Sequence, residues 1–242
     1  MEIERLSTGV EGLDEKMEGG LPKGSVTLIT GKTGTGKTAF SASFLYAGAM
    51  KGESGVYITA EEREEDIKGD IKAMFGWDFD TLEKKKLIKF ITIKPVFPGK
   101  AISGEELSRL VKLYIFDLAS KIESAIKESK AKRIVLDSIS IIEMFIKDEY
   151  MCRVAMIQLT DKLREMGVTS VLTGTVPEAT EVLSGGGIIE FIVDSIIKLD
   201  FVPVAEEFKR TMTIRKMRRT DHSIYIHPFD ITDTGLKLIE IK

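Results

Sequence analysis

The feature that most restricts the fold is a glycine-rich segment, Gly31-Lys32-Thr33-Gly34-Thr35-Gly36-Lys37-Thr38, which satisfies every fixed position of the pattern G-x-x-x-x-G-K-[ST]. An apolar, β-branched run at 25–30 precedes it, and a stretch of helix formers at 39–51 follows it. A strand, a loop and a helix in this order turn consecutive backbone N–H groups and the positive end of the helix toward one polyphosphate. The segment therefore predicts a phosphate loop that binds a nucleoside triphosphate.

Each part of the loop has an expected task. Lys37 supplies a point charge to the β- and γ-phosphates, and the Thr38 hydroxyl is a ligand for Mg²⁺. The nucleotide would also be lined by the neighbouring loop residues Thr33, Gly34, Thr35, Gly36 and Ala39. The alternative is a plain Gly/Thr turn between a strand and a helix, which the complete pattern with both flanks disfavours.

Composition limits the class of protein. With 242 residues and 43% hydrophobic content, the chain can build one large core, and we expect one domain over residues 1–242. A formal net charge of −3 argues against a surface that binds nucleic acid everywhere. Cys152 is the only cysteine, which excludes a disulfide framework and fits a reducing interior. Because the sequence shows neither a membrane-length apolar run nor a secretion signal, we expect a cytoplasmic protein without a membrane partner.

Apolar runs alternate with helical periodicity for most of the chain. The expected strands cover 25–30, 55–60, 87–93, 133–137, 168–173 and 192–199. The expected helices cover 39–51, 61–75, 103–126 and 150–166. Such alternation predicts an α/β fold with a mainly parallel sheet covered by helices on both faces. After a turn-rich stretch at 201–208, the alternating run 209–217 and two short runs, 223–226 and 235–241, predict antiparallel strands added at the C-terminal side.

Polar residues at strand ends predict the rest of the site. Asp137 ends the apolar strand 133–137, and the carboxyl edge of a parallel sheet is where ligands bind, beside the phosphate loop. We expect its carboxylate to hold Mg²⁺ through a water; capping a turn is the alternative. Thr173 ends another core strand and would lie near the γ-phosphate, although such a threonine is more often an ordinary strand end.

Glu61 and Glu62 directly follow the second expected strand at the same edge. A carboxylate that faces the γ-phosphate can orient and deprotonate the attacking water, which makes this pair a catalytic candidate. Acidic residues in a first helical turn also complement the helix dipole, and we expect only that role for Glu64, Glu65 and Asp66. Position alone leaves both roles open for Glu61 and Glu62.

Six cations lie within the eleven residues 209–219. They could form a solvated strand face, a nucleic-acid patch or a group that reaches a phosphate. Alternation places Lys216 and Arg218 on the same face of a strand, which suits two cations that converge on one anion. Arg215 and Arg219 would then face elsewhere.

These motifs, in this order, resemble the KaiC family of RecA-like ATPases over nearly the whole chain, in a single-domain form. The similar segments are 5–14, 19–25, the phosphate loop, Glu61-Glu62, 75–78, Lys216-Met217-Arg218, Thr220, His222, 228–229 and 231–233. Each string is short, but their order and spacing together are highly specific. The resemblance implies a RecA-like fold, ATP and Mg²⁺ as ligands, and Glu61 and Glu62 as the catalytic pair.

The resemblance also implies a ring, usually a homohexamer, with ATP held between neighbouring subunits. Lys216 and Arg218 would reach the γ-phosphate of the ATP bound to the next subunit. Further residues would line the nucleotide from that side: Met217, Thr220, His222, Thr232 and Asp233. Two positions depart from the family pattern. Glu190-Phe191 replaces a Ser-Thr pair of the autokinase half, so we expect no self-phosphorylation of that kind, and Arg219 stands where the family usually has glycine.

The leading hypothesis is an Mg²⁺-dependent ATPase in which water attacks the γ-phosphorus. One alternative is a DNA-binding recombinase or repair accessory ATPase, and another is a slow ATP-switched scaffold that signals to an unidentified protein partner. The segment 174–188 is the candidate DNA loop, but it contains Glu178 and Glu181 and no Lys or Arg. A site that tracks a nucleic-acid backbone is basic and aromatic, so a nucleic-acid partner is not favoured.

Overall fold

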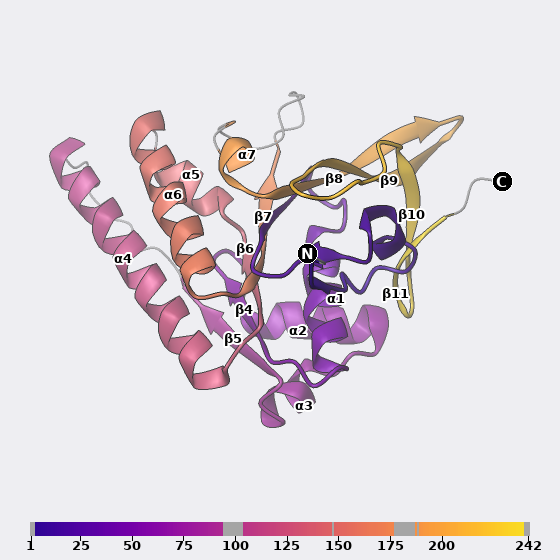
Figure 1. The fold of residues 1–242 in the computed structure, drawn as a ribbon, viewed down its shortest axis with the longest axis horizontal. Coiled ribbons are helices and arrows are strands. Elements are labelled where there is room, and N and C mark those ends of the chain that lie inside the picture. Colours follow the sequence, from indigo (N-terminus) through magenta and orange to yellow (C-terminus); the bar gives the residue numbers. More distant parts are fainter. Residues whose placement is uncertain (1–2, 94–103, 147, 177–186, 188, 240–242) are drawn as a thin grey trace.

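A nine-stranded sheet runs through the centre of the part of the chain that the structure describes (Figure 1). This computed structural model describes residues 3–93, 104–146, 148–176, 187 and 189–239. The strands of the sheet are β3 (Val26–Gly31), β4 (Gly55–Thr59), β5 (Ile88–Thr92), β6 (Arg133–Asp137), β7 (Thr169–Thr175), β8 (Ser195–Val204), β9 (Glu207–Met217), β10 (His227–Thr232) and β11 (Gly235–Leu238). A separate two-stranded sheet pairs β1 (Arg5–Leu6) with β2 (Leu21–Pro22) near the N-terminus.

The strand order is β11-β10-β9-β8-β3-β7-β6-β4-β5. From β8 to β5 all neighbouring strands are parallel, whereas β8–β9, β9–β10 and β10–β11 are antiparallel. The predicted fold class, a mainly parallel sheet with antiparallel strands added at the C-terminal side, is therefore confirmed. Because parallel strands all end at one edge, β3, β4, β6 and β7 bring their carboxyl ends together there.

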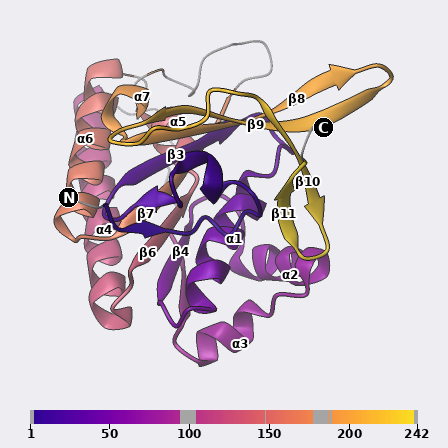
Figure 2. The same ribbon diagram turned by 45° about the vertical axis from the view of Figure 1, so that its right-hand side comes forward.

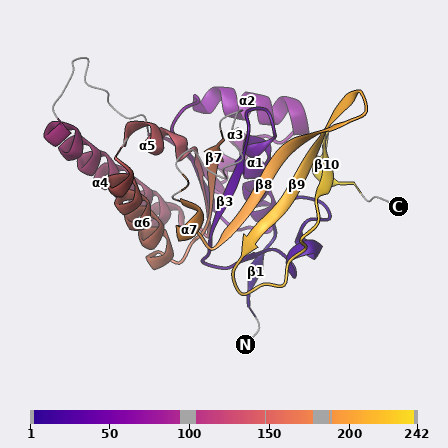
Figure 3. The same ribbon diagram turned by 90° about the horizontal axis from the view of Figure 1, so that it is seen from above.

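Helices cover both faces of the sheet (Figures 1 and 3). One face carries α1 (Lys37–Ala49), α2 (Glu64–Phe75) and α3 (Phe79–Lys84). The other carries α4 (Gly104–Ser129), α5 (Ser140–Phe145) and α6 (Glu149–Glu165). Successive strand residues alternate between the two faces, so that Leu28 packs under α4–α6 and Ile29 under α1. This double burial explains why the central strands are continuous apolar runs. Two short elements complete the order: the 3₁₀ helix η1 (Asp14–Met17) and α7 (Ile189–Ile192).

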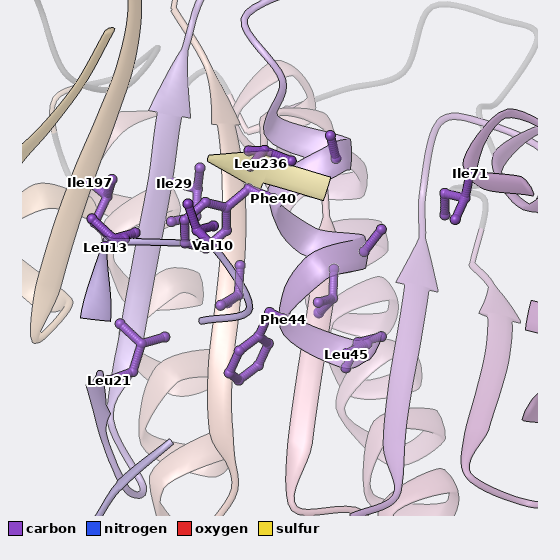
Figure 4. Packing of buried hydrophobic residues seen from close by; sticks show 14 of the residues in the cluster. Val10, Leu13, Leu21, Ile29, Phe40, Phe44, Leu45, Ile71, Ile197 and Leu236 are labelled. Atoms are coloured by element: carbon purple, nitrogen blue, oxygen red, sulfur yellow. The ribbon is translucent and has the colours of Figure 1, made fainter. Parts of the chain in front are cut away.

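The helix that follows the phosphate loop is the centre of one hydrophobic cluster (Figure 4). Phe40 and Phe44 of α1 are fully buried in this cluster, and Phe40 lies beside Ile29 of β3. Val10 of the N-terminal segment and Leu236 of β11 join the same cluster. The hairpin of β10 and β11 thereby curls back over α1 (Figure 2). Segments from both ends of the chain thus hold α1, and with it the loop, against the sheet.

The C-terminal third differs from the sequence prediction in three places. The stretch 201–208 is not a turn-rich connection, because β8 continues to Val204 and β9 starts at Glu207 with only two residues between them. The run 223–226 is not a strand: β10 begins at His227, where the ladder with β9 starts, and Ile224 and Tyr225 are 80% and 73% exposed. The strand expected from residue 192 begins at Ser195, because residues 189–192 form α7.

Other expectations were incomplete, and some lie outside the described residues. The short helices α3 and α5 were not expected from the sequence. Residue 103 of the expected helix 103–126 lies outside the described ranges, as do residues 177–186 and 188 of the candidate DNA loop. None of the helices in the described part of the chain combines the length and the apolar character needed to cross a bilayer.

Candidate nucleotide site

The phosphate loop connects β3 to α1 in a tightly closed conformation. A side chain on Gly31 would clash, because its Cβ would lie 2.3 Å from the carbonyl oxygen of Leu199. Gly34 and Gly36 have φ values of 79° and 107°, in the left-handed region that glycine adopts without strain. The expected strand, loop and helix are therefore all present, and α1 begins at Lys37 with its free N–H groups at the loop.

Lys37 closes the loop from the inside. Its Nζ donates hydrogen bonds to the carbonyl oxygens of Gly31, at 2.9 Å, and Lys32, at 2.8 Å. Desolvation lowers the pKa of Lys37, while the carboxylates of Asp137 and Glu61 act in the opposite direction. A partly desolvated ammonium among backbone carbonyls gains strongly from a phosphate, so the loop is arranged for an anion.

Asp137, at the end of β6, is the polar centre of the site. Its Oδ2 accepts hydrogen bonds from the Thr38 hydroxyl at 3.1 Å and from the Tyr57 hydroxyl at 2.6 Å. Its Oδ1 accepts a hydrogen bond from the hydroxyl of Thr173. The structure thus brings together Thr38 and Asp137, the two expected Mg²⁺ ligands, and adds Thr173 of β7, a strand that continues two residues beyond the expected end to Thr175. Hydroxyl and carboxylate oxygens are the donors that Mg²⁺ prefers, so this set fits that ion.

Sequence reasoning missed Tyr57. It lies in β4, a strand buried on both faces, where a tyrosine reads as one more large core residue. Its hydroxyl is nevertheless directed at Asp137, and desolvation together with that carboxylate raises the pKa of Tyr57 well above its ordinary value. The hydroxyl is therefore a protonated donor at neutral pH. One signal could have revealed it: a buried tyrosine needs a hydrogen-bond partner for its hydroxyl, and the neighbouring strand ends in an aspartate.

We expect Tyr57→Phe to lower the free energy of unfolding by about 2 kcal/mol, the scale of a buried hydrogen bond to a charged group. Urea unfolding of the variant without nucleotide measures this loss. In an Asp137→Asn background the same substitution should cost clearly less, because the charged acceptor is gone. Tyr150→Phe is the matched control, since Tyr150 is 73% exposed. Equal losses for Tyr57→Phe in both backgrounds would show that the contact with Asp137 contributes nothing.

Glu61 and Glu62 precede α2 rather than belonging to it. The helix begins at Glu64, so the acids of its first turn are Glu64, Glu65 and Asp66, as expected. The helix-dipole explanation therefore does not account for Glu61 and Glu62.

Both residues of the pair follow the end of β4, at the edge of the sheet where Asp137 lies. Glu61 accepts a hydrogen bond from the hydroxyl of Ser138, the residue after Asp137. The Thr59 hydroxyl donates to the carbonyl of Glu62 at 2.8 Å, which fixes that part of the backbone. Desolvation raises the pKa of Glu62, and repulsion from the carboxylates of Asp137 and Asp70 adds to the shift. A raised pKa makes a carboxylate a stronger base, which suits proton abstraction from water.

Lys216 and Arg218 lie far from their own phosphate loop. Lys216 pairs with Ile196 and Met217 with Ser195, at the start of β8. Ser195 in turn pairs with Thr27, near the start of β3, whereas the phosphate loop follows the end of β3. The strand between these points spans about 13 Å at the usual rise per residue. Figure 3 shows this arrangement, with α7 beside the starts of β3 and β8. The two cations are therefore at the opposite end of the sheet from the loop of the same chain.

The other residues that were expected to line the nucleotide lie in two places, some near Lys216 and Arg218 and some near the phosphate loop. Thr220 and His222 follow the cations; Thr220 Oγ1 accepts a hydrogen bond from Arg5 at 3.0 Å. Thr232 and Asp233 lie instead beside the phosphate loop of their own chain. Ile231, which directly precedes Thr232, contacts the loop: a Cβ built on Gly36 would lie 3.3 Å from its Cδ1. The resemblance placed these two residues with the cations, on the side of the neighbouring nucleotide; the geometry places them next to the loop of the same chain.

With this geometry established, a comparison with known proteins decides the family. The family model of the KaiC ATPase matches residues 6–242. The chain belongs to the KaiC family. This KaiC family member is 37% identical to a UPF0273 protein of Thermotoga maritima over 236 residues, which are 97% of this chain and 95% of that protein. It is 36% identical to the circadian clock protein KaiC3 of Synechocystis sp., covering 99% of this chain and 46% of the relative.

Solved structures agree. The fold matches the crystal structure of a KaiC-like protein from Pyrococcus horikoshii with a TM-score of 0.84 and 38% sequence identity, over 99% of this chain and 100% of that one. The predicted RecA-like fold of the KaiC family is therefore confirmed. Membership of this ATPase family also supports ATP binding at the phosphate loop.

One departure from the family pattern lies at a position whose backbone conformation favours glycine. Arg219 has a φ of 57°, in the left-handed region that favours the glycine expected from the resemblance. The turn after Lys216 and Arg218 thus keeps the glycine-like conformation with a larger residue in it. An arginine in this conformation carries local backbone strain that glycine would avoid.

Proposed function

We propose that this KaiC family member is a single-domain, Mg²⁺-dependent ATPase whose site is shared between neighbouring protomers of a ring. The position of Lys216 and Arg218 supports the shared site most directly. The phosphate loop, Asp137 and Glu61-Glu62 meet at the carboxyl edge of the sheet, but the two cations lie at the opposite end. A head-to-tail contact between protomers would bring the cations of one protomer against the phosphate loop of the next.

Within one protomer, the loop and the start of α1 hold the triphosphate. The backbone N–H groups of residues 33–39 and the ammonium of Lys37 contact the phosphates, and Thr232 and Asp233 border the nucleotide from the same chain. Thr38 and Asp137 would hold Mg²⁺, which when bound neutralises charge on the β- and γ-phosphates. Glu62, whose pKa is raised, accepts a proton from the attacking water, and Glu61 orients that water.

The neighbouring protomer completes the reaction. Its Lys216 and Arg218 stabilise the charge that develops on the equatorial oxygens of the γ-phosphoryl group. Thr220 and His222 accompany them on the same surface, whereas the side chain of Met217 is buried in the cluster around α1, so that Met217 can border the nucleotide only through its backbone. Hydrolysis then depends on assembly, because an isolated protomer has the attacking water and the base but lacks these cations.

The test is to measure molecular mass and ATPase rate on the same samples over a range of protein concentrations. We expect turnover per protomer to rise with concentration in step with the appearance of the ring, and Lys37→Ala to remain inactive throughout. Full turnover by dilute monomers would contradict the shared site. A salt-sensitive rise in turnover on adding single-stranded DNA would instead favour the recombinase-like alternative.

A further inference from the structure

The carbonyl groups at the end of α7 hold the two C-terminal cations. Lys216 Nζ donates to the carbonyl oxygens of Glu190, at 3.0 Å, and Val193, at 2.6 Å. Arg218 Nη2 lies 3.5 Å from the carbonyl oxygen of Phe191. The last carbonyls of a helix carry partial negative charge and lack partners within the helix, so they attract cations. These bonds restrict both side chains without pairing Lys216 with a full negative charge.

Arg164 of α6 and Asp194 complete this network. Arg164 Nη2 donates to the carbonyl of Ile192 at 2.7 Å, and its Nε lies 3.3 Å from Oδ2 of Asp194. The Asp194 carboxylate lies 3.6 Å from Nη1 of Arg218 and accepts a hydrogen bond from the backbone N–H of Val26 at 3.0 Å. Asp194 is thus anchored to β3, the strand that leads into the phosphate loop, and it contacts both arginines.

The network contains more positive than negative charge. Arg164, Lys216 and Arg218 are three cations, Asp194 contacts both arginines, and Asp161 is a second carboxylate, which pairs with Arg164 at 2.9 Å. Desolvation, Arg218 and Arg164 all lower the pKa of Lys216, and only Asp194 acts in the other direction. The side chain of Arg218 is 53% exposed while that of Asp194 is 14% exposed. An anion that approaches from outside therefore meets the cations first and relieves their mutual repulsion.

We infer that Arg164 and Asp194 are positioning residues for the shared site: they hold the end of α7 and Arg218, and so place Lys216 and Arg218 for the nucleotide of the neighbouring protomer. This inference rests on the proposed sharing of the site. Arg164 contacts Asp161, the carbonyl group of Ile192 and Asp194, none of which belongs to the phosphate loop. Its loss should therefore act on turnover in the adjoining site and leave binding at its own loop unchanged.

The first experiment compares kinetic constants. Arg164→Ala should lower kcat about 10- to 100-fold, the scale of a catalytic group displaced by about 1 Å. The dissociation constant for ATP should stay unchanged, because the loop of the same chain sets it. Asp194→Asn, which keeps an oxygen for the Val26 N–H, should lower kcat by a similar factor. Arg164→Lys should recover part of the kcat that Arg164→Ala loses. Arg153→Ala, on the exposed face of the same helix, should match the wild type.

The second experiment locates the defect by mixing variants. Lys37→Ala destroys the loop but keeps the cations, whereas Arg164→Ala keeps the loop. Mixed in equal amounts, they restore an intact loop opposite intact cations at about one interface in four, so activity should exceed that of either variant alone. Lys216→Ala mixed with Lys37→Ala is the reference for the shared site itself.

The outcomes separate the two ideas. If the reference mixture is active but Arg164→Ala is fully active alone, or its mixture with Lys37→Ala stays silent, the shared site stands and the positioning role is wrong. If the reference mixture is silent, the shared site fails and this inference fails with it. Activity in both mixtures, with a defective Arg164→Ala protein alone, supports the positioning role.

Discussion

Replacing Glu61 and Glu62 together with glutamine is expected to stop ATP turnover while ATP binding persists. Glutamine keeps the size and the hydrogen-bond acceptor that faces Ser138, but it cannot accept a proton from the attacking water. General-base catalysis contributes typically about 10²–10⁴-fold, so turnover should fall by at least this factor. Single-turnover ATP hydrolysis measures the rate, and a fluorescent ATP analogue measures binding.

The matched control is Glu64→Gln with Glu65→Gln, two acids of the first turn of α2. These residues act on the helix dipole, and Glu64 also pairs with Lys68 of the same helix rather than with a residue of the site, so the control should turn over ATP at close to the wild-type rate. The pH dependence gives a second check. Because the pKa of Glu62 is raised, turnover should fall with decreasing pH at a higher pH than an ordinary glutamate would produce. Undiminished turnover in the Glu61/Glu62 variant would remove the pair from the mechanism.

Removing either C-terminal cation should have the other large effect. Lys216→Ala or Arg218→Ala is expected to lower turnover by about 10³-fold or more, as loss of a cation that stabilises the transferring phosphoryl group does. The reason is electrostatic, since either variant leaves only one of the two assigned cations of the adjoining protomer at that group. ATP affinity should change little, because Lys37 and the loop belong to the protomer that binds the nucleotide.

Mixing shows in which subunit the cation acts. Arg218→Ala protomers should gain activity when they share rings with Lys37→Ala protomers, whose cations are intact. Arg215→Ala is the control: Arg215 lies exposed on the same strand, next to Lys216. If the mixture of Arg218→Ala and Lys37→Ala is no more active than its components, Arg218 acts within its own subunit.

Local chemistry made much of the site predictable. The expected strand, loop and helix around residues 31–38 agree with β3 and α1 to within two residues, because glycine conformations and helix propensity act over a few neighbours. The proximity of Thr38 and Asp137 was also predictable, because parallel strands end at one edge. The contacts of Tyr57 and Asp194 were not predictable, because the sequence of a buried strand or of a strand start does not reveal where a single polar group points.

The errors in the C-terminal third have a common cause. Residues 201–208 contain Pro203 and an Ala-Glu-Glu run and read as a turn, yet most of them extend a two-stranded ribbon in which Val202 pairs with Lys209. Residues 223–226 read as a strand, yet no strand of the described chain pairs with them. In both cases the local composition predicts the wrong structure. A segment becomes a strand when a neighbouring strand pairs with it, and stays outside the sheet when none does.

By itself, the sequence determined that residues 31–38 form a phosphate loop between a strand and a helix and that a parallel sheet places carboxylates beside it, because these features depend on short-range chemistry and on alternation along the chain. Only the tertiary structure decided where Lys216 and Arg218 lie. Their distance from the loop of their own chain follows from the pairing of β8 beside β3, in the register of Ser195 with Thr27. Such a register between segments far apart in sequence is set by packing of the whole core, and no local pattern encodes it.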